Sequence, residues 1–137
     1  MVTLEETIDA HAGMVRRVAT VYERHPDRVD DLVQEVWMAV WQALPRLNSP
    51  DTLKAYIARI TQDICVTAVR RAIVRQTESV TDVLPSTAPP IDEATGHAME
   101  LALLVEYVRS LPDNLKSVVS LYLEGMPIKE IAVALGI

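Results

Sequence analysis

The sequence predicts an all-α protein in which a three-helix bundle and a second helical module are joined by a linker. Apolar residues recur at spacings of three and four over most of the chain, whereas the alternating pattern of β-strands is absent. One proline-rich stretch interrupts the helical period. Half of the 137 residues are hydrophobic, yet no apolar run approaches the roughly eighteen residues that a membrane span requires. We therefore expect a globular protein with no membrane partner.

The first two helices are predicted by their caps and by their apolar stripes. The capping-box pair Thr3 and Glu6 opens the first helix. Its stripe consists of Leu4, Ile8, His11, Val15, Val18 and Tyr22. Pro26 can begin the second helix. The stripe of this helix consists of Val29, Leu32 or Val33, Val36, Val40 and Leu44.

A third helix completes the bundle, which we assign to residues 1–76. It follows the turn-rich segment 45–51 and runs from Thr52 to about Gln76. Its inward positions are Leu53, Ile57, Ile60, Ile64 and Ala68. Two short connections then join three helices into one unit.

Residues 77–93 are expected to form a flexible linker, because they combine prolines with several Ser and Thr and lack a sustained apolar period.

Residues 94–137 are expected to form the second module, in which three further apolar stripes each mark a helix. These stripes are Leu101, Leu104, Val105, Val108 and Leu111; Leu115, Val118, Val119 and Tyr122; and Ile128, Ile131 and Leu135.

The last segment, EGMPIKEIAVALGI, has the pattern of the first half of a helix-turn-helix. Gly125 ends one helix, Pro127 can start the next, and Gly136 permits a tight turn, while the small Ala132 lets two helices cross closely. A helix with a glycine stop is the alternative, and spacing alone does not separate the two. The sequence given ends at Ile137, so we expect the motif to be incomplete and to lack its groove-reading helix.

Enzymatic chemistry is not expected. His11, His25 and His97 share no helical spacing suited to a metal, and Cys65 has no partner cysteine. There is no glycine-rich phosphate loop and no nucleophile motif, so we expect no catalytic residue, metal, cofactor or small-molecule substrate. The start of the sequence has no secretory signal pattern, which favours a cytoplasmic location.

Charge is unevenly distributed along the chain. The net charge of −6 argues against nucleic-acid binding, because phosphate contacts draw on clustered Lys and Arg. Residues 52–76, however, carry five basic side chains against the single carboxylate of Asp63. The basic residues are Lys54, Arg59, Arg70, Arg71 and Arg75. One basic helix therefore lies in an otherwise acidic chain.

Two segments resemble the sigma factors of the extracytoplasmic-function group, within the sigma-70 family of bacterial RNA polymerase. DDLVQEVWMAVWQAL, residues 30–44, is similar to the region 2 signature of that group. SLPDNLKSVVSLYLEGMPIKEIAVALGI, residues 110–137, is similar to the start of region 4. The resemblance implies a transcription initiation factor that binds core RNA polymerase and promoter DNA, with an anti-sigma factor as an inhibitory partner.

Candidate polymerase-binding residues lie on the second helix. Asp31, Gln34, Glu35 and Met38 fall at i, i+3, i+4 and i+7, and so form one acidic and amide-bearing stripe beside the edge of a tryptophan. Such a stripe suits a basic partner helix, and the resemblance implies docking on the clamp helices of the largest polymerase subunit. A solvated helix face is the alternative.

Candidate DNA-binding residues lie on the third helix and on the loop before it. Arg59 and Arg70 share a face, and Arg70, Arg71 and Arg75 concentrate positive charge that can hold a phosphate backbone. The loop, with Asn48 and Ser49, can accept an unstacked base, and Tyr56 is the main aromatic platform for stacking. The resemblance implies that this helix and loop recognise and melt the minus-ten element.

Two residues depart from the family pattern, which usually has Asn at position 63 and Asp at position 67. This chain has Asp63 and Thr67. A carboxylate on a DNA-facing surface opposes binding, although Asp63 can pair with Arg59 four residues earlier. An incomplete helix-turn-helix also implies that the minus-35 element is not read.

Two alternatives remain. One is a sigma-like interaction module that binds polymerase or an anti-sigma factor without melting DNA. The other is an unrelated helical regulator, which predicts no affinity for core polymerase.

Overall fold

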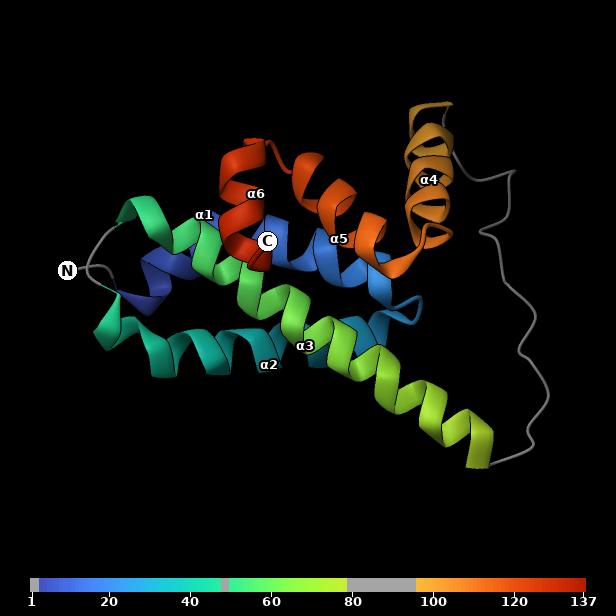
Figure 1. The fold of residues 1–137 in the computed structure, drawn as a ribbon, viewed down its shortest axis with the longest axis horizontal. Helices are drawn as coiled ribbons and strands as arrows, with labels where there is room; N and C mark the ends of the chain where they lie inside the picture. The colour runs from blue at the N-terminus through green and yellow to red at the C-terminus, as the bar shows by residue number, and fades with distance from the viewer. Residues whose placement is uncertain (1–2, 48–49, 79–95) are drawn as a thin grey trace.

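Six α-helices and one short 3-10 turn make up residues 3–47, 50–78 and 96–137, which are the residues that the computed structural model describes. In chain order they are α1 (Leu4–Tyr22), α2 (Pro26–Ala43), η1 (Leu44–Arg46), α3 (Pro50–Glu78), α4 (Gly96–Arg109), α5 (Asp113–Tyr122) and α6 (Ile128–Leu135). No strand occurs within these residues, so the all-α prediction is confirmed (Figure 1). None of the described helices is long and apolar enough to cross a membrane.

The starts of α1 and α2 follow the predicted caps. The Thr3 hydroxyl accepts a hydrogen bond from the Glu6 amide at 3.2 Å, and the Glu6 carboxylate accepts one from the Thr3 amide at 3.4 Å. This confirms the capping box. Pro26 occupies the first turn of α2, where its missing N–H costs nothing. The predicted stripes are buried at Val15 and Val18 of α1, and at Val29, Leu32, Val36 and Val40 of α2.

Helix α3 is longer than predicted and has a wider buried face. It begins at Pro50 and runs to Glu78, two residues past the predicted end near Gln76. Leu53 and Ile57 are buried as expected. Residues on the adjacent strip of the helix surface are buried as well, namely Ala58, Thr61, Gln62 and Cys65. The face is wide because α1 and α2 pack on one side of α3 while α6 packs on another.

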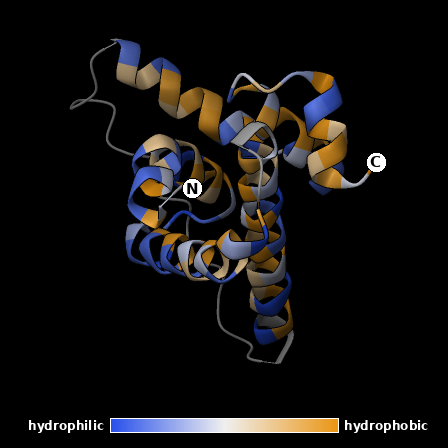
Figure 2. Ribbon diagram, turned by 90° about the vertical axis from the view of Figure 1, so that its left-hand side faces the viewer, coloured by the Kyte–Doolittle hydropathy of each residue, from blue (hydrophilic) through white to orange (hydrophobic). Residues whose placement is uncertain are grey.

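The last turns of α3 leave the bundle. Residues 70–75 are all exposed, and both views show this end projecting past the other helices (Figures 1 and 2). The arginines of this segment are therefore exposed near a helix end that extends past the bundle.

Helices α5 and α6 pack on the first bundle. One hydrophobic cluster joins Val15 of α1 and Ile57 of α3 with Leu121, Met126 and Ile131 of the C-terminal segment. The division of the chain at 76 and 94 into two modules remains a prediction.

Glycines at positive φ define the turns around α6. Gly125 has φ of 80° and Gly136 has φ of 72°, a conformation that glycine adopts without steric cost. Pro127 caps α6, which begins at Ile128. The segment therefore has the helix boundaries that its sequence predicts.

Candidate functional site

The α2 face, defined as Asp31, Gln34, Glu35 and Met38, is exposed at all four positions. Val36 and Val40 on the opposite side of the helix are fully buried, and they fix its orientation. The Met38 side chain is 63% exposed. The α2 face is therefore free to contact a partner.

The two tryptophans of α2 differ. Trp37 packs against the core cluster, whereas Trp41 is exposed. Trp41 lies three residues after Met38, so the two apolar side chains lie on neighbouring positions of one face. The sequence did not decide between the tryptophans, and the structure assigns Trp41 to the surface.

The predicted basic residues of α3 differ in their partners. The Nε of Arg59 lies 4.0 Å from the Asp63 carboxylate, with both side chains well exposed. Such a surface pair contributes a few tenths of a kcal/mol at most. Arg70 and Arg71 are exposed and, among the described residues, form no ion pair. They remain free to contact phosphates.

Thr67 uses its hydroxyl within the helix. Its Oγ1 donates to the carbonyl oxygen of Asp63 at 2.7 Å. The side chain thus satisfies its donor on α3 itself, as Thr commonly does in helices.

A charged groove of about 640 Å³ lies between α2 and α3. It brings Asp31 and Glu35 of the α2 face together with Arg71 and Arg75 of α3. Sequence reasoning treated these residues as two separate sites. It also missed Arg28, which lines the same groove and which its position three residues before Asp31 could have indicated.

A second groove, of about 320 Å³, contains Tyr56, and we call it the Tyr56 groove. One wall is formed by the end of the α2–α3 connection and by α3, the other by α6. The lining residues are Leu47, Thr52, Ala55, Tyr56, Arg59, Lys129, Glu130, Val133 and Ala134. The ring of Tyr56 is partly accessible, with 37% exposure. Asn48 and Ser49 lie outside the described residues.

A polar network joins α1, α3 and α5. The Tyr22 hydroxyl donates to Gln62 Oε1 at 2.5 Å, and Gln62 Nε2 donates to the Ser120 hydroxyl at 2.9 Å. Burial raises the pKa of Tyr22 to about 12. Ser120 of α5 is buried within this network, whereas Leu115 and Tyr122 of the predicted apolar stripe are exposed.

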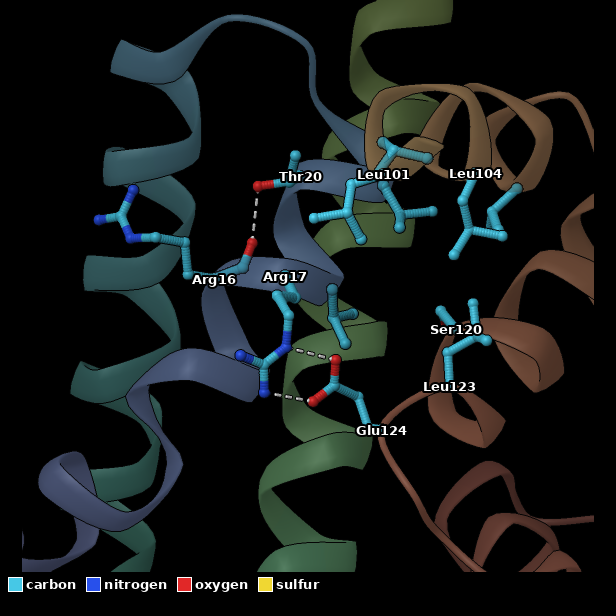
Figure 3. Close-up of a pocket in the computed structure, with 12 residues that line it drawn as sticks. Arg16, Arg17, Thr20, Leu101, Leu104, Ser120, Leu123 and Glu124 are labelled. Atoms are coloured by element: carbon cyan, nitrogen blue, oxygen red, sulfur yellow. Dashed lines mark hydrogen bonds and ion pairs between the residues drawn. The ribbon is translucent and has the colours of Figure 1, made fainter. Parts of the chain in front are cut away.

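A second set of contacts centres on Glu124, in the turn between α5 and α6. The Arg17 guanidinium of α1 donates to both carboxylate oxygens of Glu124, at 2.6 and 2.7 Å (Figure 3). These hydrogen bonds raise the pKa of Arg17. Lys54 of α3 donates to the Glu124 carbonyl oxygen at 3.2 Å. We refer to these three interactions as the Glu124 contacts.

The buried thiol is chemically inert. Cys65 is fully buried between the helices of the first bundle, and burial raises its pKa to about 12. A protonated thiol is a poor nucleophile and metal ligand. Within the ranges that the structure describes, no group of three or more His, Cys, Asp or Glu side chains is placed to hold a metal.

Part of the chain matches a known protein family. Residues 7–73 match the family model of sigma-70 region 2. No solved structure matches the chain. Sigma-70 region 2 is a non-enzymatic transcription-factor domain that, at the level of the family, serves polymerase binding and promoter recognition. The match covers α1 from Thr7 onward and all of α2, and it extends through Arg70 and Arg71 of α3.

Proposed function

We propose that this chain is a sigma factor of the extracytoplasmic-function group, whose α2 face docks on the clamp helices of the largest subunit of core RNA polymerase. The observation that carries the proposal is the match to sigma-70 region 2, within which Asp31, Gln34, Glu35 and Met38 are all exposed on one face. Carboxylates and an amide on a rigid helix suit a basic helical partner, because opposite charges steer the encounter and fix its register.

Promoter contact is assigned to α3. Arg70 and Arg71 project with their helix end into solvent, where a phosphate backbone can reach them. Tyr56 offers a partly exposed ring for stacking an unpaired base. Together with the loop before α3, these residues would recognise the minus-ten element.

A second function is favoured by one specific observation. Asp63 projects into solvent near Arg59, with 74% of its side chain exposed, on the helix that would face DNA. A sigma-like module that binds polymerase or an anti-sigma factor without melting DNA would tolerate this carboxylate. Such a module would keep the α2 face and dispense with DNA contact.

The test is a co-sedimentation assay with core polymerase and a promoter fragment opened beforehand near its start site. A sigma factor retains the DNA in the complex with polymerase. Core binding without DNA retention would exclude the initiation role and leave the interaction role. No core binding would exclude both and favour an unrelated regulator. Asp63→Asn serves as the informative variant, because it removes the opposing charge and is expected to increase DNA retention.

A further inference from the structure

Helix α4 is anchored to the bundle near its C-terminal end. Val108 is buried, and the Arg109 guanidinium donates to the Thr20 carbonyl oxygen of α1 at 2.7 and 3.1 Å. The Glu106 carboxylate accepts hydrogen bonds from Arg24 and Arg109, both at 2.6 Å. Residues 96–102, by contrast, include no buried side chain. This half of α4 stands out from the other helices (Figures 1 and 2).

The projecting part of α4 is apolar over much of its circumference. Met99, Leu103 and Tyr107 recur at intervals of four and form one exposed strip. Leu101 and Leu104 lie on the neighbouring side of the helix, and both are exposed as well. At about 100° per residue, these five side chains span about 200° of the helix surface. A surface helix usually has one apolar stripe of about 100°, and that stripe faces the core.

A groove of about 440 Å³ lies beside this helix, between α1, α4 and α5. Leu101 and Leu104 reach it from α4, and Leu123 reaches it from the end of α5 (Figure 3). Val18 and Val21 of α1 line it as well. Because Leu101 and Leu104 belong to both the helix surface and the groove, the two form one apolar surface. We call it the α4 patch, and its exposed members are Met99, Leu101, Leu103, Leu104, Tyr107 and Leu123.

The α4 patch is large enough to form an interface with a second copy of the chain. Taking about 200 Å² for each large side chain, the exposed fractions of its six members, from 36% to 66%, amount to on the order of 600 Å². A specific interface buries roughly 1,200 to 2,000 Å² in total, shared between the two partners. Two α4 patches placed together therefore reach the lower end of that range, which corresponds to a reversible dimer.

Charge near the α4 patch is balanced within the chain. Arg17 pairs with Glu124, and Glu106 pairs with Arg24 and Arg109, each at 2.6 Å. The charged residues of the groove, those of α4 and their partners comprise four arginines and four carboxylates, namely Arg16, Arg17, Arg24 and Arg109 with Asp30, Glu100, Glu106 and Glu124.

This balance favours a second copy over a charged partner. The net charge of −6 lies outside the set, and salt screens it over about 8 Å. A strongly acidic or basic partner would find no excess of opposite charge here to select it. A second copy presents the same neutral, apolar surface, and a twofold contact brings one patch against its equal.

We propose that the α4 patch is a homodimerisation surface, in which the exposed strip of α4 from each copy packs into the groove of the other. The inference is independent of the proposed function, because the patch contains no residue of the α2 face and none of Tyr56, Arg70 and Arg71. Figure 1 also shows α4 above the bundle and α2 below it.

The test is sedimentation velocity of the chain over a hundredfold range of protein concentration. We expect the parent chain to shift from monomer to dimer as the concentration rises. Leu103→Asp should raise the dimer dissociation constant at least tenfold, because it places an unpaired carboxylate in a desolvated contact. Leu103 is 66% exposed in the single chain, so the substitution leaves the fold intact, as circular dichroism would verify. Ile128→Asp is the matched control, with the same change at a 76% exposed position of α6 outside the patch.

Hydrogen exchange locates the contact. In the parent chain, the amides of α4 should exchange more slowly as the protein concentration rises, whereas those at the projecting end of α3 should not change. A parent chain that stays monomeric over the whole range would overturn the inference. Equal weakening by Leu103→Asp and Ile128→Asp would overturn it too, as would a dimer whose α4 amides gain no protection. Core polymerase binding decides the proposed function separately, since the variants leave the α2 face unchanged.

Discussion

Replacing Arg70 and Arg71 together by Ala is expected to reduce the salt dependence of promoter retention by a calculable amount. Both side chains are exposed on the projecting end of α3 and form no ion pair among the described residues, so each can neutralise one phosphate. Each phosphate contact contributes roughly 0.7 to the slope of log affinity against log salt for a single strand, and roughly 0.9 for a duplex. The slope should therefore become shallower by about 1.4 to 1.8.

The consequence is large enough to measure. When the salt is raised from 50 to 200 mM, the fold loss of DNA affinity in the double variant should be roughly 7 to 12 times smaller than that in the parent chain. The assay is retention of a fluorescent pre-opened promoter by the chain bound to core polymerase, titrated at four salt concentrations. Arg16→Ala is the control, because Arg16 is a comparably exposed arginine that pairs with Asp30 across α1 and α2. An unchanged slope in the double variant, with the control also unchanged, would remove both arginines from the DNA interface.

Further predictions concern polymerase docking, the hydrophobic core, and the ionisation of the Cys65 thiol and the Tyr22 hydroxyl. Glu35→Lys on the α2 face should weaken binding to core polymerase at least tenfold by pull-down titration, whereas Asp9→Lys, at an exposed position of α1, should not; equal effects would argue against the α2 face. Ile57→Ala should lower the free energy of unfolding by about 2 to 5 kcal/mol in urea titrations, because the side chain is fully buried in the main cluster. Native Cys65, with its pKa near 12, should fail to react with a disulfide reagent at neutral pH and react fully in denaturant; rapid native labelling would contradict its burial. Tyr22 has a folded pKa of about 12 against about 10 in the unfolded chain, so its contribution to stability is complete below about pH 10 and is lost as the pH rises toward 12. The urea midpoint of Tyr22→Phe should accordingly fall less between pH 9 and pH 11 than that of the parent chain.

The parts of the fold that were predictable are those decided by local chemistry. The capping box at Thr3, the proline start of α2 and the two positive-φ glycines act within a few residues of chain, so the sequence carries the whole signal. The α2 stripe was also predictable, because a helix packed on one side alone has a simple buried face.

The parts that were not predictable depend on what packs against them. Ser120 is buried because Gln62 of α3 donates to it, and nothing near Ser120 in the sequence identifies that partner. The broad buried face of α3 likewise arises because two sets of helices contact it. In the candidate site, the exposure of Glu35 could be predicted from its position relative to the buried stripe of α2. The α6 wall beside Tyr56 could not be predicted, because it depends on contacts between residues more than seventy positions apart along the chain.

The acidic net charge is reconciled with DNA binding by where the charges lie. Asp31 and Glu35 share a groove with Arg71 and Arg75, so in the free chain carboxylates oppose the field that the arginines present to phosphates. Charges that lie within the screening length of about 8 Å at physiological salt are only partly screened from one another. A basic polymerase helix seated on the α2 face would neutralise these two carboxylates and so reduce their opposition to the arginines. Under the proposed function, polymerase docking thus increases the affinity of α3 for DNA by electrostatics alone, while the free acidic chain is kept from binding DNA indiscriminately.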